Sequence, residues 1–208
     1  MDESSEWPLY HIGSRDHLHA IGVVIASWNI IETAYQTLIQ LIFASNVKAG
    51  IHAFELLGND ERVKLIRAQL PNIATEQEMD LLDHFIKSTN ICKEYRNVLA
   101  HAGYANQPAD ELILMTKGLS KDRESTNLIR FSVGGIREMA DATYATATFG
   151  LNLWTTMNLR LSNQAWISRG VFPRFLLSLP EKPPLPRNWV QIREAPKPDP
   201  PPPQSSRG

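Results

Sequence analysis

The chain has 208 residues, of which 43% are apolar, the size and composition of one globular domain with a substantial core. Its formal net charge is -1 and its pI is about 6.6, which excludes a global positive field that would attract nucleic acid. Any RNA contact must therefore come from a local patch. The single cysteine, Cys92, excludes an intramolecular disulfide and fits a reducing cytoplasm.

The N-terminal part of the chain shows no pattern typical of targeting or membrane insertion. Its first residues are acidic and lack the basic start and apolar run of a signal peptide. The most apolar stretch, residues 20–43, is interrupted by Asn29, Glu32, Gln36 and Gln40, so it falls short of the roughly 18 clean apolar residues of a membrane helix. We therefore expect a cytoplasmic protein that has no membrane partner.

The hydrophobic pattern predicts a mainly all-α domain, a bundle of about five helices over residues 17–170. An N-terminal extension at 1–16 precedes it, and a proline-rich tail at 171–208 follows it. The first helix is expected from about His17 to Phe43, where apolar residues recur in alternating steps of three and four.

Three further helices are expected before the middle of the chain. Two short ones meet at Gly58, with Asp60 as the N-cap of the second and Pro71 as its end. The next begins after Thr75, a good N-cap residue, and stops near Gly103. Its buried stripe is expected to consist of Leu81, Phe85, Ser88, Cys92, Tyr95 and Leu99.

A β-hairpin and a long helix complete the predicted domain. Residues 111–116 and 127–132 have β propensity and are separated by a polar loop, which predicts a small hairpin insertion. The last helix is expected from about Gly135 to Leu161, and its small residues at 142–150 let another helix approach closely. We expect that partner to be a helix of the same chain, and the alternative is a second protomer.

The composition changes sharply at Pro173, and eleven of the 14 prolines lie at or after it. Such a segment has too few apolar groups to build a core, so we expect it to be extended or disordered. Residues beyond about Pro180 are expected to add little stability. Composition favours a passive tail over a proline-rich docking ligand.

The familiar catalytic sequence motifs are missing from the chain. It has no GxxxxGK phosphate loop, no GxSxG motif, no HExxH and no cysteine pair for zinc. His17 and His19, with His11 nearby, could supply metal ligands, but residues two apart point to different sides of a helix. A solvated helix start is therefore favoured, and we expect neither a metal nor another cofactor.

The stretch EYRNVLAHAGY, Glu94–Tyr104, ends the fourth helix on polar residues that its core does not need. Relative to the apolar stripe, Asn97 and His101 point away from the core and Arg96 lies at the flank. His101 lies in the last turn, where the helix dipole favours an imidazolium that caps the helix or donates a proton. Arg96 and His101 are about 140° apart around the helix, too far to share a small substrate, so two facing copies of the helix are expected.

A long first helix, two short helices, a helix that closes on RNVLAH and a further helix make residues 17–165 resemble the HEPN superfamily. Ribonucleases of this family carry an arginine, a polar residue after it, and a histidine beyond four to six intervening positions. Arg96, Asn97 and His101 match this pattern. The resemblance implies metal-independent RNA cleavage, often by a toxin or defence effector, at a composite site of a homodimer.

The resemblance also implies a role for each residue of this motif. His101 is the general acid or base, Arg96 holds the phosphate as charge builds, and Asn97 orients the histidine or a phosphate oxygen. Glu32 lies near the buried stripe of the first helix, so its carboxylate needs a partner. Arg96 is one candidate, and Gln36 or a backbone group is the alternative.

Regulation and partners are less well determined by the resemblance. In family toxins with H-x-Y, a nucleotidyltransferase modifies the tyrosine, but Tyr104 lies one residue too far, so it is kept only as a supporting residue. An antitoxin or nucleotidyltransferase is still an implied partner. Many family members only bind, so the alternative function is a non-catalytic module for a nucleotide, RNA or protein partner. Basic residues that extend an RNA path, or merely form a solvated face, are Arg62, Lys64, Arg67, Lys87 and Lys93.

Overall fold

The computed structural model describes residues 14–101, 103–104, 111–117, 126–170 and 178–193. Within these ranges the chain is mainly helical with one small antiparallel sheet, which confirms the predicted fold class. The predictions made for His11, for the loop of the hairpin and for the final residues of the tail lie outside the described residues.

The elements follow one another in the predicted order. The helices are α1 (Arg15–Ile42), α2 (Val47–Leu56), α3 (Asn59–Gln69), the 3-10 turn η1 (Leu70–Asn72), α4 (Glu76–His101), α5 (Val133–Ile167) and α6 (Trp189–Arg193). The strands are β1 (Gly103–Tyr104), β2 (Glu111–Lys117) and β3 (Thr126–Ser132). None of the helices described here combines the length and apolar character needed to cross a membrane.

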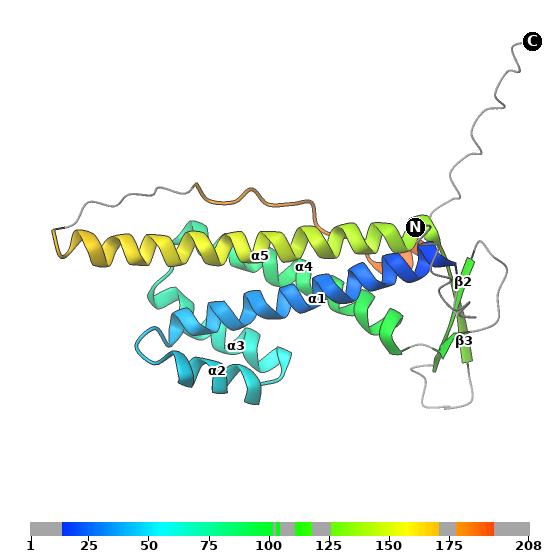
Figure 1. Cartoon of the computed structure of the whole chain (residues 1–208), viewed down its shortest axis with the longest axis horizontal. Helices are drawn as coiled ribbons and strands as arrows, with labels where there is room; N and C mark the ends of the chain where they lie inside the picture. The colour runs from blue at the N-terminus through cyan, green and yellow to red at the C-terminus, as the bar shows by residue number, and fades with distance from the viewer. Residues whose placement is uncertain (1–13, 102, 105–110, 118–125, 171–177, 194–208) are drawn as a thin grey trace, which may run out of the picture.

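Three long helices, α1, α4 and α5, lie side by side around the main core (Figure 1). α1 and α5 run in the same direction and share the most extensive contact, and α4 runs against both. α2 and α3 pack on α1 near its C-terminal end. The sheet lies at the opposite end of the bundle, beside the end of α4 that carries the predicted motif (Figure 1).

α1 follows the predicted amphipathic pattern and begins at Arg15, two residues before the predicted start. Ser14 is its N-cap, because the Ser14 hydroxyl accepts a hydrogen bond from the backbone amide of His17. The predicted stripe is buried in the core except at its two ends, Ile21 and Ile42, which are half-buried. The periodicity of apolar residues therefore placed this helix correctly and missed only the cap.

The predicted N-cap of α4, Thr75, is confirmed and forms a capping box with Glu78. The Thr75 hydroxyl accepts from the Glu78 amide at 3.2 Å, and the Glu78 carboxylate accepts from the Thr75 amide at 2.8 Å. All six residues of the predicted stripe are buried. Among them is Cys92, and burial raises the pKa of its thiol.

The predicted N-cap of α3 is wrong. The helix starts directly after Gly58, so Asp60 lies in the first turn, where its carboxylate pairs with Lys93. The helix dipole favours a carboxylate anywhere in the first turn, so Asp60 could not define the boundary. Pro71 lies in η1, the 3-10 turn that follows α3, and the helix ends there as predicted.

The small residues of α5 serve packing within the chain, as predicted. A Cβ atom added at Gly150 would lie 2.4 Å from the ring of Phe85 and 3.1 Å from the Cβ atom of Ala34. Glycine therefore allows α4 and α1 to approach α5 at one point. α5 continues to Ile167, six residues past the predicted Leu161, because no proline or glycine ends the helix where its apolar pattern ends.

β2 and β3 form the predicted hairpin, and β1 adds two residues to its edge. Leu112 lies opposite Phe131, and Leu114 lies opposite Ile129, and all four side chains are buried. One face of the sheet therefore packs on the bundle, as expected from the two-residue alternation of a strand.

Residues 178–193, called the strap below, run back along α5 towards the sheet (Figure 1). Residues 178–188 contain neither helix nor strand, so the predicted extended conformation is confirmed for them. Ile192 is buried, and Trp189 packs against the core, so the expectation that residues beyond Pro180 contribute little is wrong as far as Arg193. The prediction from composition was wrong because a proline-rich segment loses little conformational entropy when it docks on the core.

Candidate functional site

The predicted motif lies on the exposed side of the last two turns of α4. Asn97 and His101 are exposed, and Arg96 is half-buried. Cys92 and Leu99, on the opposite side of the helix, are fully buried. The orientation predicted from helical periodicity is therefore confirmed.

Arg96 contacts both other motif residues within one chain. Its Nη1 atom lies 3.0 Å from Nε2 of His101 and 3.2 Å from Oδ1 of Asn97. The prediction that Arg96 and His101 are too far apart to act together is therefore wrong, because the wheel angle describes Cβ directions and the long arginine side chain reaches across the turn. The spacing no longer requires a second protomer, and the homodimer stays a prediction from the resemblance.

This contact has a chemical consequence for His101. A guanidinium nitrogen can only donate, so a hydrogen bond between the two side chains uses Nε2 of His101 as the acceptor and leaves the ring proton on Nδ1. That tautomer of the imidazole presents a basic nitrogen to a substrate. The imidazolium expected from the helix dipole stays a prediction.

Arg96 keeps donors for a ligand. Among the described residues its hydrogen-bond partners are Asn97 and His101, and both are reached through Nη1. The Nε and Nη2 edge of the guanidinium has no such partner, and the side chain is half-exposed. That planar edge has the geometry for two parallel hydrogen bonds to a phosphate.

Glu32 takes no part in the cluster. It is half-buried on α1 and has no hydrogen bond or ion pair in the part of the chain described, so the predicted pairing with Arg96 and the alternative with Gln36 are both wrong. Tyr35 stacks on Phe85 with ring centroids 5.1 Å apart, which sets the register of the antiparallel helices α1 and α4. In that register Glu32 lies roughly two turns, or about 12 Å, along α4 from Arg96.

Tyr104 lies in β1, where its backbone pairs with Leu114 of β2. The strand begins two residues after His101 and leads the chain from the end of α4 into the sheet. Its supporting role stays a prediction.

The basic residues that could extend an RNA path are largely engaged by the protein itself. Arg67 pairs with Asp83 at 3.0 Å, and Lys93 pairs with Asp60 at 3.4 Å. Arg62 lies over an aromatic ring of α2. These contacts favour a solvated face over an RNA path for the three residues.

The histidines at the start of α1 point to different sides, as predicted. His19 is exposed, but His17 is buried with its Nδ1 atom 2.8 Å from the Ser14 hydroxyl, so the expected solvated helix start is wrong for His17. Over the described ranges, no three or more His, Cys, Asp and Glu side chains come together in a group that could hold a metal ion.

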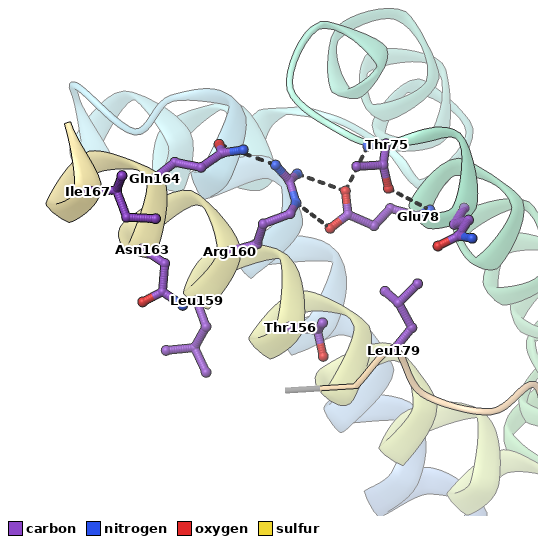
Figure 2. Close-up of a pocket in the computed structure, with 10 residues that line it drawn as sticks. Thr75, Glu78, Thr156, Leu159, Arg160, Asn163, Gln164, Ile167 and Leu179 are labelled. Carbon is purple, nitrogen blue, oxygen red and sulfur yellow. Dashed lines mark hydrogen bonds and ion pairs between the residues drawn. The ribbon is translucent and has the colours of Figure 1, made fainter. Parts of the chain in front are cut away.

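An ion pair between buried Glu78 and half-buried Arg160, which the sequence analysis missed, joins α4 to α5 (Figure 2). Arg160 donates through Nε and Nη2 to the two carboxylate oxygens of Glu78, each at 2.7 Å, and Nη2 also donates to the Ile73 carbonyl at 2.7 Å. Burial raises the pKa of Glu78, but hydrogen bonds from Arg160 and from the Thr75 backbone outweigh it and hold the pKa below its ordinary value.

The pair lines a cavity of about 330 Å³ together with Leu159, Ile167 and Leu179 (Figure 2). Both oxygens of Glu78 and both donating nitrogens of Arg160 are used within the protein, so the pair is a structural tie. The spacing of Thr75 and Glu78, typical of a capping box, could have singled out Glu78 in the sequence. Its partner Arg160 lies 82 residues away, so no local sequence pattern indicates the pair.

The chain matches no model of a known protein family, no curated protein and no solved structure to a significant degree. The resemblance to the HEPN superfamily therefore depends on the order of the helices and on the motif at the end of α4.

Proposed function

We propose that the protein is a metal-independent endoribonuclease of the HEPN type, with Arg96, Asn97 and His101 as its site. The observation that supports this most strongly is the 3.0 Å contact between Arg96 Nη1 and His101 Nε2 on an exposed helix face. It brings a guanidinium, the kind of cation that binds phosphate, within one hydrogen bond of an imidazole, the kind of group that acts as a general base. Cleavage of RNA by its own ribose hydroxyl needs this combination of groups.

In the proposed reaction the ribose 2′-hydroxyl attacks the adjacent phosphorus. Its oxygen forms a bond to phosphorus while its proton passes to Nε2 of His101, and the bond from phosphorus to the 5′-oxygen breaks. The imidazolium returns the proton to the leaving oxygen, which gives a 2′,3′-cyclic phosphate and a 5′-hydroxyl. Arg96 faces the phosphoryl oxygens through Nε and Nη2 as their negative charge grows. Asn97 holds the guanidinium through Oδ1.

Substrate binding has to separate Arg96 from His101, since Nε2 must be free to accept the hydroxyl proton. A phosphate anion is a stronger acceptor for a guanidinium than a neutral imidazole is. A phosphate bound at the free Nε and Nη2 edge therefore draws the guanidinium towards itself and away from Nε2 of His101.

The proposed active form is a cytoplasmic homodimer, acting as a toxin or defence effector that an antitoxin or nucleotidyltransferase controls. The cluster is exposed on one helix, so a second copy supplies the wall that keeps an RNA strand in place. Because Arg96 and His101 touch within one chain, mixing the Arg96→Ala and His101→Ala proteins should not restore cleavage. Recovery on mixing would show instead that the site is shared between protomers, and light scattering that finds only monomer at micromolar concentration would remove the dimer.

Cleavage of RNA by the purified full chain tests the function. Single-stranded RNA should be cut in the presence of EDTA with a 2′,3′-cyclic phosphate end, and DNA, which lacks the 2′-hydroxyl, should not be cut. His101→Ala and Arg96→Ala should each lose on the order of a hundredfold in rate. RNA binding should survive the histidine change better, because only arginine carries a permanent charge.

Two variants serve as matched controls. His19→Ala removes another exposed histidine of a long helix, and Arg67→Ala removes another half-exposed arginine, and both should keep the full rate. A wild type that leaves varied RNAs uncut from pH 5 to 9, or a double mutant of Arg96 and His101 that cuts equally well, would favour the non-catalytic binding module.

A further inference from the structure

The strap is tied to α5 and to the sheet at the end of the bundle that carries the site. Arg187 forms an ion pair with Glu138 near the start of α5, with its Nε atom 2.5 Å from the carboxylate. Trp189 packs edge-to-face on the buried ring of Phe131 with centroids 6.4 Å apart. Ile192 is buried beside α5. These three contacts hold the strap on α5 and the sheet, and none of them involves α4.

The strap contacts α4, the helix that carries the site, at two described points: Lys182 pairs with Asp80 near the start of the helix, and Arg187 meets Tyr95 beside the site. Tyr95 is fully buried, and its hydroxyl donates to the backbone carbonyl of Arg187. Tyr95 directly precedes Arg96 and lies on the buried side of α4, whereas Asn97 and His101 are exposed. Burial raises the pKa of the Tyr95 hydroxyl well above its usual value, so the group stays protonated and remains a donor.

The last turns of α4 are the part of the helix that most needs such support. The final four carbonyls of a helix have no partners within it, so helix ends open more easily than their middles. The contact between Arg96 and His101 spans these same turns, and opening the helix end would separate the two side chains.

We infer that the strap positions the proposed active site by fixing the last turns of α4 from their buried side. Tyr95, Arg187 and Trp189 are positioning residues, which act through the backbone of α4 and not on the RNA. The effect on catalysis rests on the proposed function. The effect on the geometry of the cluster does not, and it can be measured without RNA.

The test uses the full chain with Tyr95→Phe, which removes one hydroxyl and keeps the buried ring, and Trp189→Ala, which removes the anchor on the sheet. In both variants the amides of residues 96–101 should exchange with solvent on the order of fivefold faster, the expected effect of losing one hydrogen bond. The ¹⁵N signals of the His101 ring should shift as Nε2 loses its donor. The turnover number for RNA should fall several-fold with its Michaelis constant nearly unchanged.

Two further variants supply controls. Lys182→Ala breaks the strap's ion pair with Asp80, roughly 22 Å along α4 from Tyr95, and should leave the His101 signals unchanged. Arg187→Glu should behave like the positioning variants, and combining it with Glu138→Arg should restore the wild-type signals.

The results separate this inference from the proposed function. Unchanged His101 signals in both Tyr95→Phe and Trp189→Ala, or faster exchange spread evenly over all of α4, would overturn the positioning role. The expected signal changes in a protein that cuts no RNA would uphold the role of the strap and overturn only the nuclease.

Discussion

Gly150, where α5 lies close against α4 and α1, gives the most specific stability prediction. In Gly150→Ala the new methyl group would lie 2.4 and 2.6 Å from two ring carbons of Phe85. Ordinary contacts between carbon atoms are about 3.5–4.0 Å, so the overlap exceeds roughly 1 Å. The ring cannot move aside easily, because it is fully buried and packed against Tyr35 and Phe149.

Two opposing effects set the size of the change. Alanine is favoured over glycine inside a helix by about 1 kcal/mol. Overpacking a core costs typically about 1–3 kcal/mol, and the size and rigidity of this overlap place it at the upper end. The net loss of unfolding free energy should therefore be about 2 kcal/mol, which lowers the melting temperature of a domain of this size by roughly 4–8 °C.

Gly22 offers a matched control, since it lies inside α1 and a Cβ atom there would meet nothing within 4 Å. Gly22→Ala should gain up to about 1 kcal/mol from helix propensity alone. Thermal and urea unfolding of both variants measure the difference, and Phe85→Leu should partly rescue Gly150→Ala. Gly150→Ala that melts at or above the wild type would refute the packing argument.

Two other predictions concern acid stability and the strap. Because folding lowers the pKa of Glu78, its pair with Arg160 contributes stability that is present above the ordinary value of 4.5 and is lost as pH falls through the lower folded value. Glu78→Gln should lower the free energy of unfolding by on the order of 3 kcal/mol at pH 7. Below about pH 4.5 the variant should lose less further stability than the wild type. Equal losses of stability for the two proteins in melts from pH 7 to 3 would contradict this. A chain that ends at Arg193 should melt at the same temperature as the full chain. A chain that ends at Leu177 should melt several degrees lower, because it loses the apolar contacts of α6. Equal melting temperatures for the two truncated chains would show that the strap contributes no stability.

Local patterns predicted the fold well. The apolar period of the first helix, the Thr75 cap and the alternation in the hairpin each depend on neighbours within a few residues, and the structure confirms all three. The failures involve distant residues. The partner of Glu78 and the docking of the strap could not be predicted, because both depend on contacts between distant residues, across 82 residues for Glu78 and across 49 to 92 residues for Arg187 of the strap.

The candidate site shows the same division. Periodicity predicted which faces of α4 hold Asn97 and His101, because burial follows the helix angle. It failed for the distance between Arg96 and His101, because the rotamers of a long side chain are not determined by the angle of its Cβ atom. It failed for Glu32 because the register between two antiparallel helices is set by which core residues interlock.

The place of the strap in the chain has a consequence for the order of folding. Tyr95 and Arg187 are 92 residues apart, so the ribosome makes the acceptor of this hydrogen bond long after its donor. The three long helices precede the strap and can pack as they are synthesised, whereas a contact of such large sequence separation forms late. For the proposed nuclease, this order would leave the end of α4 without the support of the strap while the chain is still being translated, beside the ribosomal and messenger RNA that a finished site could cut.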